Sequence, residues 1–366
     1  MKKRLFFLLA LIIVIIFCLF NFSKQEYLIG SSLPLKGIMS DMGNSVKLGT
    51  NLSFKVYEKH LNKKIKYQFL DDRYEPKLTQ ENIKKLYKNN IFLLYGIVGT
   101  PTVKKILLFL NNNSVYLYAP FSGAKFLRKN KYVLNFRASY KDEINKILNY
   151  LLEHNLTKIA VFYQNDEYGN EIYYDTYEIL KKRNLNLLTA GAYKRNTFFI
   201  TPAFNEIAKN KPQAIIMGST SKVSAMFIKK YKKIDPKVVF CTISFVNPDS
   251  LIKLLKNTEN IIFSEVVPYY KDKSIKEAVL FEKYFKKYFP DKKPTFFAFE
   301  AYLANKILLR AFNKLTFPYT SSHLVNIIKN TPSDFLKGIE IKYKNNQLLN
   351  KTYLFKYENN TFKELK

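Results

Sequence analysis

Residues 158–184 read KIAVFYQNDEYGNEIYYDTYEILKKRN, and this stretch carries the pattern on which the fold prediction rests. The apolar run over 158–163 predicts a buried strand, and the segment 169–184 predicts a helix. Residues 141–154 come just before and place apolar side chains at the spacing of one helix face: Ile144, Ile147, Leu148, Leu151 and Leu152. A strand between two helices is the repeating unit of a parallel sheet covered on both faces.

The same alternation of strand and helix runs through the rest of the chain. Further strands are expected at 27–33, 66–70, 91–97, 115–120, 132–136, 186–193, 213–219, 237–243 and 260–267. A polar hairpin is expected over 339–360. Because the alternation occurs twice in succession, it predicts an α/β fold of two doubly wound parallel-sheet lobes. In such sheets, ligands bind at the carboxyl ends of the strands.

Composition is compatible with two globular domains and excludes several other classes. The chain has 366 residues, 47% of them hydrophobic, with only 11 Gly and 13 Pro, which excludes collagen-like and disordered chains. Lys and Arg number 60 against 29 Asp and Glu, giving a net charge of +31. Only seven of the basic residues are Arg, and the lysines are spread evenly. This pattern favours a solvated lysine-rich surface, so we expect no nucleic-acid partner.

The residues needed for common catalytic and metal chemistry are missing from the sequence. Two cysteines, Cys18 and Cys241, and three scattered histidines provide neither a disulfide framework nor a metal cluster. The GxGxxG, GxxxxGK[ST], GxSxG and HExxH motifs are also absent. We therefore expect no cofactor, no metal, no catalytic residues and no enzymatic activity.

The chain begins with MKKR and continues with an uninterrupted apolar run over 5–20, which is typical of an export segment. The run is slightly long for a signal-peptide core of about 7–15 residues and slightly short for a membrane span of about 20. Residues 1–24 are therefore predicted to be a signal peptide or an N-terminal membrane anchor, with 5–22 as the anchoring part. Phe17 argues against lipidation at Cys18, because a lipobox has a small residue before its cysteine. The remainder is expected in the periplasm.

Hydroxyl and aromatic side chains follow the predicted strands in both halves. Thr100 precedes Pro101, a pair that suits the N-cap and first position of a helix, whose free amides attract carboxylates. Ser122 follows the next strand. In the second half, Tyr168 and Thr220 occupy similar positions. Each alone is more often a helix cap or a plain turn, but their shared location indicates a polar, aromatic-walled cleft between the lobes.

Seven segments, taken in this order, give the chain a resemblance to a known family. They are IGSSLPLKG (29–37), DDRYEP (71–76), GIVGTPTV (96–103), APFSGAKFLR (119–128), NFRASYKDE (135–143), VFYQNDEYG (161–169) and FFAFEAYLA (296–304). The chain resembles the type I periplasmic binding proteins, specifically the leucine/isoleucine/valine-binding family that supplies ABC transporters. The resemblance runs from about 27 to 345. It implies two lobes that are joined by three hinge crossovers and close on a ligand: 27–137 plus 267–335, and 138–266 plus 336–366.

The resemblance also implies which residues bind the ligand. They are Thr100, Ser122, Gly123, Ala124, Tyr168, Thr220, Ser244 and Phe245. The first four would hold a carboxylate and Tyr168 would cover the ligand. Thr220 lies near the sequence position at which the family has a second tyrosine. Ser244, flanked by Phe245, stands where the family has an acidic residue for the ligand's ammonium group.

The serine at position 244 is a departure from the family pattern, and it affects the expected ligand. A hydroxyl can accept a hydrogen bond but cannot neutralise a charge, so Asp166, Glu167 or Glu300 would have to substitute. We therefore expect weak or no binding of leucine, isoleucine and valine. A ligand without a free α-ammonium group should bind better.

The sequence thus predicts a solute-binding protein that captures a small polar metabolite, amino-acid-like, amide or carboxylate, and delivers it to an ABC permease. Its expected partners are the small-molecule ligand, the permease and, if the first segment is not cleaved, the inner membrane. A membrane-anchored sensing domain that signals to a partner is the alternative. A second alternative is an extracytoplasmic α/β enzyme.

Overall fold

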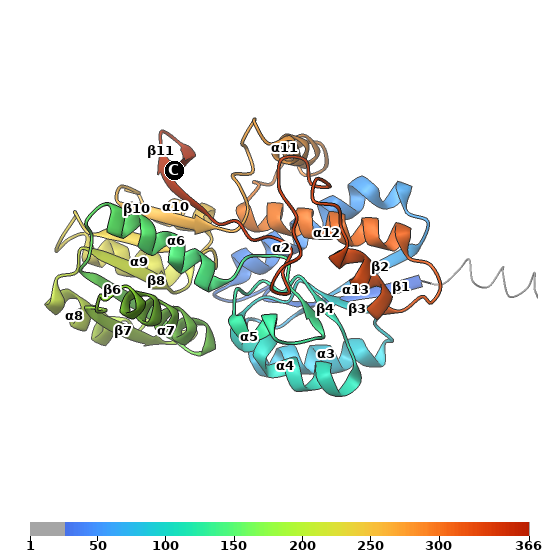
Figure 1. Ribbon diagram of the computed structural model, residues 1–366, viewed down its shortest axis with the longest axis horizontal. Coiled ribbons are helices and arrows are strands. Elements are labelled where there is room, and N and C mark those ends of the chain that lie inside the picture. Colours follow the sequence, from blue (N-terminus) through green and yellow to red (C-terminus); the bar gives the residue numbers. More distant parts are fainter. Residues whose placement is uncertain (1–25, 366) are drawn as a thin grey trace, which may run out of the picture.

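A computed structural model describes residues 26–365 and shows two α/β lobes side by side (Figure 1). The predicted fold is confirmed, because each lobe contains one sheet: the first is wholly parallel, and the second is parallel except for β11, which runs antiparallel to both of its neighbours. The predicted signal peptide or anchor, 1–24, lies outside the described residues. None of the helices within 26–365 combines the length and the apolar character needed to cross a membrane.

Lobe one is built on a five-stranded sheet in the order β2-β1-β3-β4-β5. Its strands are β1 (Glu26–Leu33), β2 (Lys64–Asp71), β3 (Leu93–Tyr95), β4 (Leu117–Tyr118) and β5 (Val133–Leu134). Its helices are α2 (Ser40–Tyr57), the 3-10 helix η1 (Glu58–His60), α3 (Pro76–Lys88), α4 (Thr100–Asn113), α5 (Lys125–Arg128), α11 (Lys276–Tyr288), α12 (Phe296–Lys314) and α13 (Ser321–Lys329). The last three return from late in the chain, and α12 lies along α2 (Figure 1).

Lobe two is built on a seven-stranded sheet in the order β12-β11-β10-β9-β8-β6-β7. Its strands are β6 (Ile159–Asn165), β7 (Thr189–Lys194), β8 (Ala214–Gly218), β9 (Val239–Thr242), β10 (Ile261–Glu265), β11 (Tyr353–Glu358) and β12 (Thr361–Leu365). Its helices are α6 (Tyr140–Glu153), α7 (Glu167–Lys182), α8 (Thr201–Asn210), α9 (Ser221–Tyr231) and α10 (Pro248–Leu254). Every residue of β8 and β10 is buried, as expected for strands covered on both faces.

The predicted hairpin over 339–360 is wrong in its position, since the observed hairpin is formed by β11 and β12. Its turn is the pair Asn359-Asn360, with φ of 51° and 60°, the left-handed conformation that two-residue hairpin turns require. The earlier pair Asn345-Asn346 has φ of 51° and 56° and makes a similar tight turn. The sequence therefore holds two nearly identical turn signals, and only the second is the tip of the observed hairpin.

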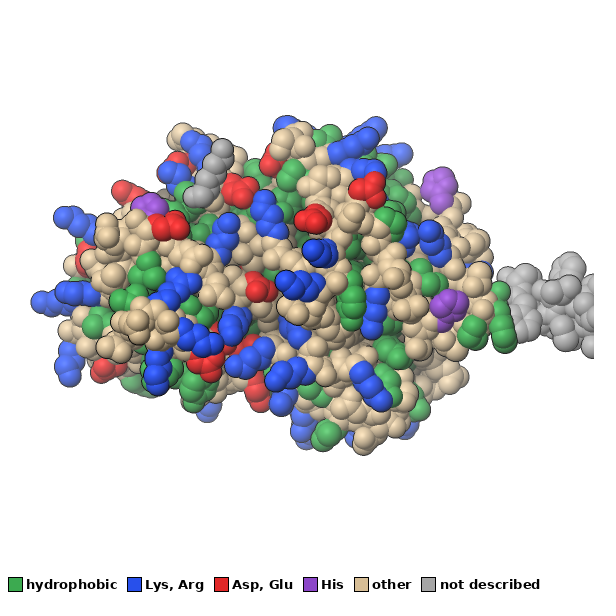
Figure 2. All heavy atoms as spheres, viewed as in Figure 1, with side chains coloured by type: hydrophobic (Ala, Val, Ile, Leu, Met, Phe, Trp, Pro, Cys, Tyr) green, Lys and Arg blue, Asp and Glu red, His purple; other side chains and the backbone are tan. Residues whose placement is uncertain are grey.

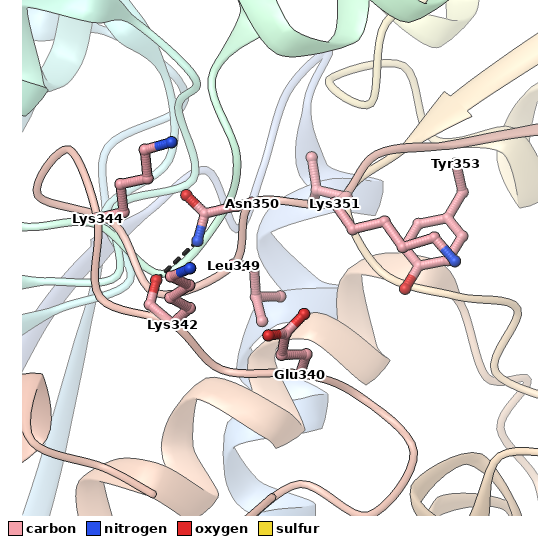
Figure 3. A pocket seen from close by; sticks show the side chains of 8 residues that line it. Glu340, Lys342, Lys344, Leu349, Asn350, Lys351 and Tyr353 are labelled. Carbon is pink, nitrogen blue, oxygen red and sulfur yellow. Dashed lines mark hydrogen bonds between the residues drawn. The ribbon is translucent and has the colours of Figure 1, made fainter. Parts of the chain in front are cut away.

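The segment before β11 pairs with another part of the chain instead of with itself. The amides of Leu348 and Leu349 donate to the carbonyls of Asn135 and Phe136, at 3.1 and 2.8 Å. The chain passes from one sheet to the other three times: after β5, after β10 and before β11. The first of these passages, at 135–136, and the third, at 348–349, thus run side by side. Where the third passage meets Val266 of the second, they enclose a pocket of about 230 Å³ (Figure 3). The exact residues at which each lobe ends stay a prediction.

The basic side chains do not gather into one patch on the face shown in Figure 2. Lysine and arginine side chains are scattered over both lobes there, with acidic side chains between them. Several lysine ammonium groups lie over aromatic rings, for example Lys230 at 4.1 Å from the centre of the Phe204 ring. Such contacts use the lysine side chain for local packing.

Candidate functional site

The lobe-one part of the predicted site comes together at the ends of two neighbouring strands. The hydroxyl oxygens of Thr100 and Ser122 are 2.8 Å apart, and both side chains are fully buried. Tyr140, the first residue of α6, brings its hydroxyl to 3.5 Å from that of Thr100. Thr100 was expected to be an N-cap, but the N-cap of α4 is Gly99, with φ of 104°. The Thr100 hydroxyl is therefore available to Ser122.

Gly123 and Ala124 lie beside this pair, and each makes a backbone hydrogen bond there. The carbonyl of Gly123 accepts from the amide of Tyr140 at 3.0 Å. The amide of Ala124 donates to the Ser122 hydroxyl at 3.3 Å. In this arrangement these two residues position Ser122 and Tyr140.

The lobe-two part of the site is centred on Tyr168, in the first turn of α7. Its ring packs on Phe245 at 4.5 Å and on Tyr140 at 5.4 Å between centroids. Asp166 caps α7 by accepting from the amides of Tyr168 and Gly169, at 3.0 and 3.2 Å. The Tyr168 hydroxyl is fully buried and has no hydrogen-bond partner among residues 26–365.

A chain of hydrogen bonds that the sequence analysis missed links Thr220 to lobe one. The Thr220 amide donates to the Tyr193 hydroxyl at 3.3 Å, and that hydroxyl donates to Gln164 Oε1 at 3.2 Å. Gln164 Nε2 in turn donates to the hydroxyl of Tyr74 at 3.2 Å. The Thr220 side chain is itself buried and also lies against the Tyr193 hydroxyl. Gln164 and Tyr74 both lie just at or after strand ends, so the rule that found Ser122 could have found them.

A second missed residue, Glu143, supplies a carboxylate at position 244. Ser244 donates to Glu143 from its amide and from its hydroxyl, both at 2.8 Å, and the Ser264 hydroxyl adds a third bond at 2.9 Å. Glu143 is fully buried. Burial raises the pKa of this carboxyl to about 7, against the opposing effect of the Arg137 charge. The sequence signal was weak, because an acid in a first helical turn normally needs no further explanation.

The three acids that were expected to substitute at this position have other roles. Glu300 forms a bidentate ion pair with Arg137, at 2.9 and 2.8 Å. Asp166 caps α7, and Glu167 is exposed in the first turn of that helix. The pocket in Figure 3 is also separate from this site, since none of the eight predicted residues lines it.

The lobes are joined at the rim of the site by polar contacts. Arg195, which follows β7, donates to the carbonyl of Tyr74 at 2.6 Å and to Glu75 Oε2 at 2.8 Å. Asn196 also donates to Glu75. Elsewhere on the rim, the amide of Lys125 donates to Glu171 of α7. We call the contacts of Arg195 and Asn196 with Tyr74 and Glu75 the rim latch.

Removing the rim latch should open the two lobes. In Arg195→Ala we expect a larger radius of gyration by small-angle scattering, because the hydrogen bond to the Tyr74 carbonyl and the ion pair with Glu75 across the lobes are lost. The free energy of unfolding should change by less than about 1 kcal/mol, since the ion pair is partly exposed. Arg183→Ala is the matched control, because the Arg183 side chain bonds within its own lobe, to Asn145 and Asn149. Equal radii in all three proteins would contradict the latch.

Comparison with known proteins agrees with the two-lobed fold. A family model described as periplasmic binding protein matches residues 26–361. The structure of a possible leucine/isoleucine/valine-binding protein from Rhodopirellula baltica SH 1 has a TM-score of 0.89 at 24% identity, covering 94% of this chain and 97% of that one. A branched-chain amino acid ABC transporter structure from Thermus thermophilus, with bound valine, has a TM-score of 0.81 at 15% identity, covering 94% and 96%. At these identities the structures establish a shared fold.

Among curated proteins, an uncharacterized protein of Methanocaldococcus jannaschii is 24% identical over 187 residues. The match covers 48% of this chain and 45% of that protein, so it spans less than half of the relative's length. The family model, in contrast, extends from the first described strand into the last one. With two parallel-sheet lobes and this family match, the chain belongs to the periplasmic binding protein family.

Proposed function

We propose that this chain is an extracytoplasmic solute-binding protein that holds a small polar metabolite between its lobes and delivers it to an ABC permease. The metabolite is amino-acid-like, an amide or a carboxylate. The observation that carries the proposal is the fully buried hydroxyl of Tyr168, which finds no hydrogen-bond partner within 26–365. Buried polar groups are nearly always paired, because an unpaired one costs free energy.

The site draws on both lobes, as a closing mechanism requires. Thr100 and Ser122 come from lobe one, whereas Tyr168 and Thr220 come from lobe two. A ligand that contacts both sets binds the closed arrangement better than the open one and so favours closure. Closure in turn gives a permease a way to distinguish loaded from empty protein. Family membership supports the extracytoplasmic location and the transport role.

The binding site is tested by replacing Tyr168 with alanine and, in a separate control variant, replacing a surface tyrosine of the same helix. A thermal-shift screen against amino acids, amides and small carboxylates first identifies a binder, since a ligand of the folded state raises the melting temperature. Tyr168→Ala should then weaken its binding by about 1–3 kcal/mol, through lost aromatic contact and hydrogen bonding. Tyr174→Ala is the control, because Tyr174 is 55% exposed on α7. Unchanged affinity in a folded Tyr168→Ala protein would contradict the assignment.

A further inference from the structure

Two acidic side chains of α7 are buried where that helix of lobe two faces α5 of lobe one (Figure 1). Glu171 and Asp175 lie four residues apart, and so on the same face of the helix. Glu171 is 8% exposed and Asp175 is fully buried. We call these two residues the acid pair. Acidic side chains are seldom this buried unless they are paired, so their partners decide what the contact can do.

Lobe one meets both carboxylates with one residue, Lys125, at the start of α5. The amide of Lys125 donates to Glu171 Oε1 at 2.5 Å. The ammonium group of the same lysine lies 3.6 Å from Asp175 Oδ1, and the lysine side chain is 53% exposed. One half-exposed cation therefore faces two buried carboxylates. Because both contacts cross from one lobe to the other, they exist only while α5 and α7 are together.

The other charged groups around the acid pair act on it from a distance. Arg128 of α5 favours the charged form, but it donates its hydrogen bonds to backbone carbonyls and to an amide side chain. From the other helices of lobe two, Lys141 of α6 favours the charged form, whereas Glu178 of α7 opposes it. Lys104 of α4, which also packs beside α7, holds its ammonium group over the ring of Phe126. The direct neutralisation therefore depends on the one lysine.

Contact between the lobes keeps the acid pair away from water. Loss of water opposes the charged form of a carboxylate, and a second carboxylate one helical turn away opposes it further. Burial raises the pKa of Glu171 to about 7, although the hydrogen bond from the Lys125 amide acts in the opposite direction. Burial also raises the pKa of Asp175, against the charge of Lys125. Separating α7 from α5 returns both groups to water, where the pKa of a glutamate is about 4.3.

We propose that the acid pair and Lys125 form a proton-linked contact, in which closing the lobes takes up a proton from solvent on a carboxylate oxygen and opening them releases it. The inference goes beyond the proposed function, because it concerns the movement of the lobes and needs no particular ligand. A group whose pKa is higher in the closed arrangement binds more protons there, so the closed arrangement gains stability as the pH falls. For Glu171 this gain is present at about pH 5.5 and is lost by about pH 8.

The test is small-angle scattering of the full chain, without ligand, at about pH 5.5 and about pH 8. The wild type should have the smaller radius of gyration at the lower pH, with a change on the order of tenfold in the ratio of closed to open molecules. Glu171→Gln should stay compact at both pH values, because its amide oxygen still accepts from Lys125 and needs no proton. Glu167→Gln is the matched control and should follow pH as the wild type does, because Glu167 is exposed on the same helix.

A second variant keeps the test decisive if Glu171→Gln does not fold. Lys125→Met keeps the backbone amide but removes the ammonium group, so it should resemble the wild type at about pH 5.5 and be more open than the wild type at about pH 8. Lys129→Met, at the exposed end of α5, should behave like the wild type at both. The inference is overturned if the radius of the wild type does not change with pH, or if Glu171→Gln or Lys125→Met follows pH as the wild type does. None of these results bears on the proposed ligand, so the proposed function stands or falls separately.

Discussion

Replacing Arg137 by Ala should lower the free energy of unfolding by about 3–5 kcal/mol, because it leaves a buried carboxylate without its partner. Arg137 is the largest of the fully buried side chains, and Glu300 is only 3% exposed. The guanidinium also lies over the ring of Phe121, at 5.7 Å from its centre. Urea unfolding of the variant and the wild type measures the difference.

Two comparison variants show whether the loss comes from the unpaired charge. Arg310→Ala removes an arginine from the same helix as Glu300, where it makes a 3.5 Å bond to Thr331 and lies over the ring of Phe335, at 5.2 Å from its centre, without any buried ion pair in the described chain. That change should cost no more than about 0.5 kcal/mol. The double variant Arg137→Met, Glu300→Leu should recover most of the stability, since an apolar pair replaces a buried ion pair at little cost. A loss below about 1 kcal/mol in Arg137→Ala would refute the buried-charge argument.

The fold was predictable because its signals are local. Strands such as β6 are apolar over their whole length, and helices such as α6 repeat their apolar side chains at helical spacing. Local signals also explain why the hairpin formed by β11 and β12 was misplaced. Two Asn-Asn turns lie fourteen residues apart, and only tertiary pairing distinguishes them. The passage at 348–349 is held by Asn135 and Phe136, which are more than 200 residues away in sequence.

The site was only partly predictable because its chemistry depends on partners from distant segments. The strand-end rule brought Thr100 and Ser122 together, and their hydroxyls do meet. It could not reveal that the first turn of α6 passes over the ends of β9 and β10 and carries Glu143 onto Ser244. The strand-end rule also could not reveal the partners of Gln164, whose bonds to Tyr193 and Tyr74 join three segments that are distant in sequence.

Gly169→Ala should disturb the ligand site more than any change of similar size. A Cβ at this position would lie 1.9 Å from the carbonyl oxygen of Gln164 and 2.7 Å from its amide nitrogen. Because these are backbone atoms, no side-chain rotation relieves the contact, and the first turn of α7 must move away from the end of β6. That movement weakens the Asp166 cap and displaces Tyr168 together with Gln164. We expect a stability loss of about 1–3 kcal/mol, as for other overpacked sites.

The matched control is Gly49→Ala, which creates an equally close contact far from the ligand. Its Cβ would lie 2.0 Å from the carbonyl oxygen of Ala298, where α2 packs on α12 in lobe one. Both variants should lose stability. Comparing their affinities for the ligand therefore separates a general loss of stability from a local disturbance of the ligand site. With each protein titrated below its melting temperature, Gly169→Ala should bind an identified ligand at least about tenfold more weakly, and Gly49→Ala should bind it normally. If Gly169→Ala lost stability yet kept full affinity, Tyr168 would not be a ligand contact, because the turn that holds it had moved without effect.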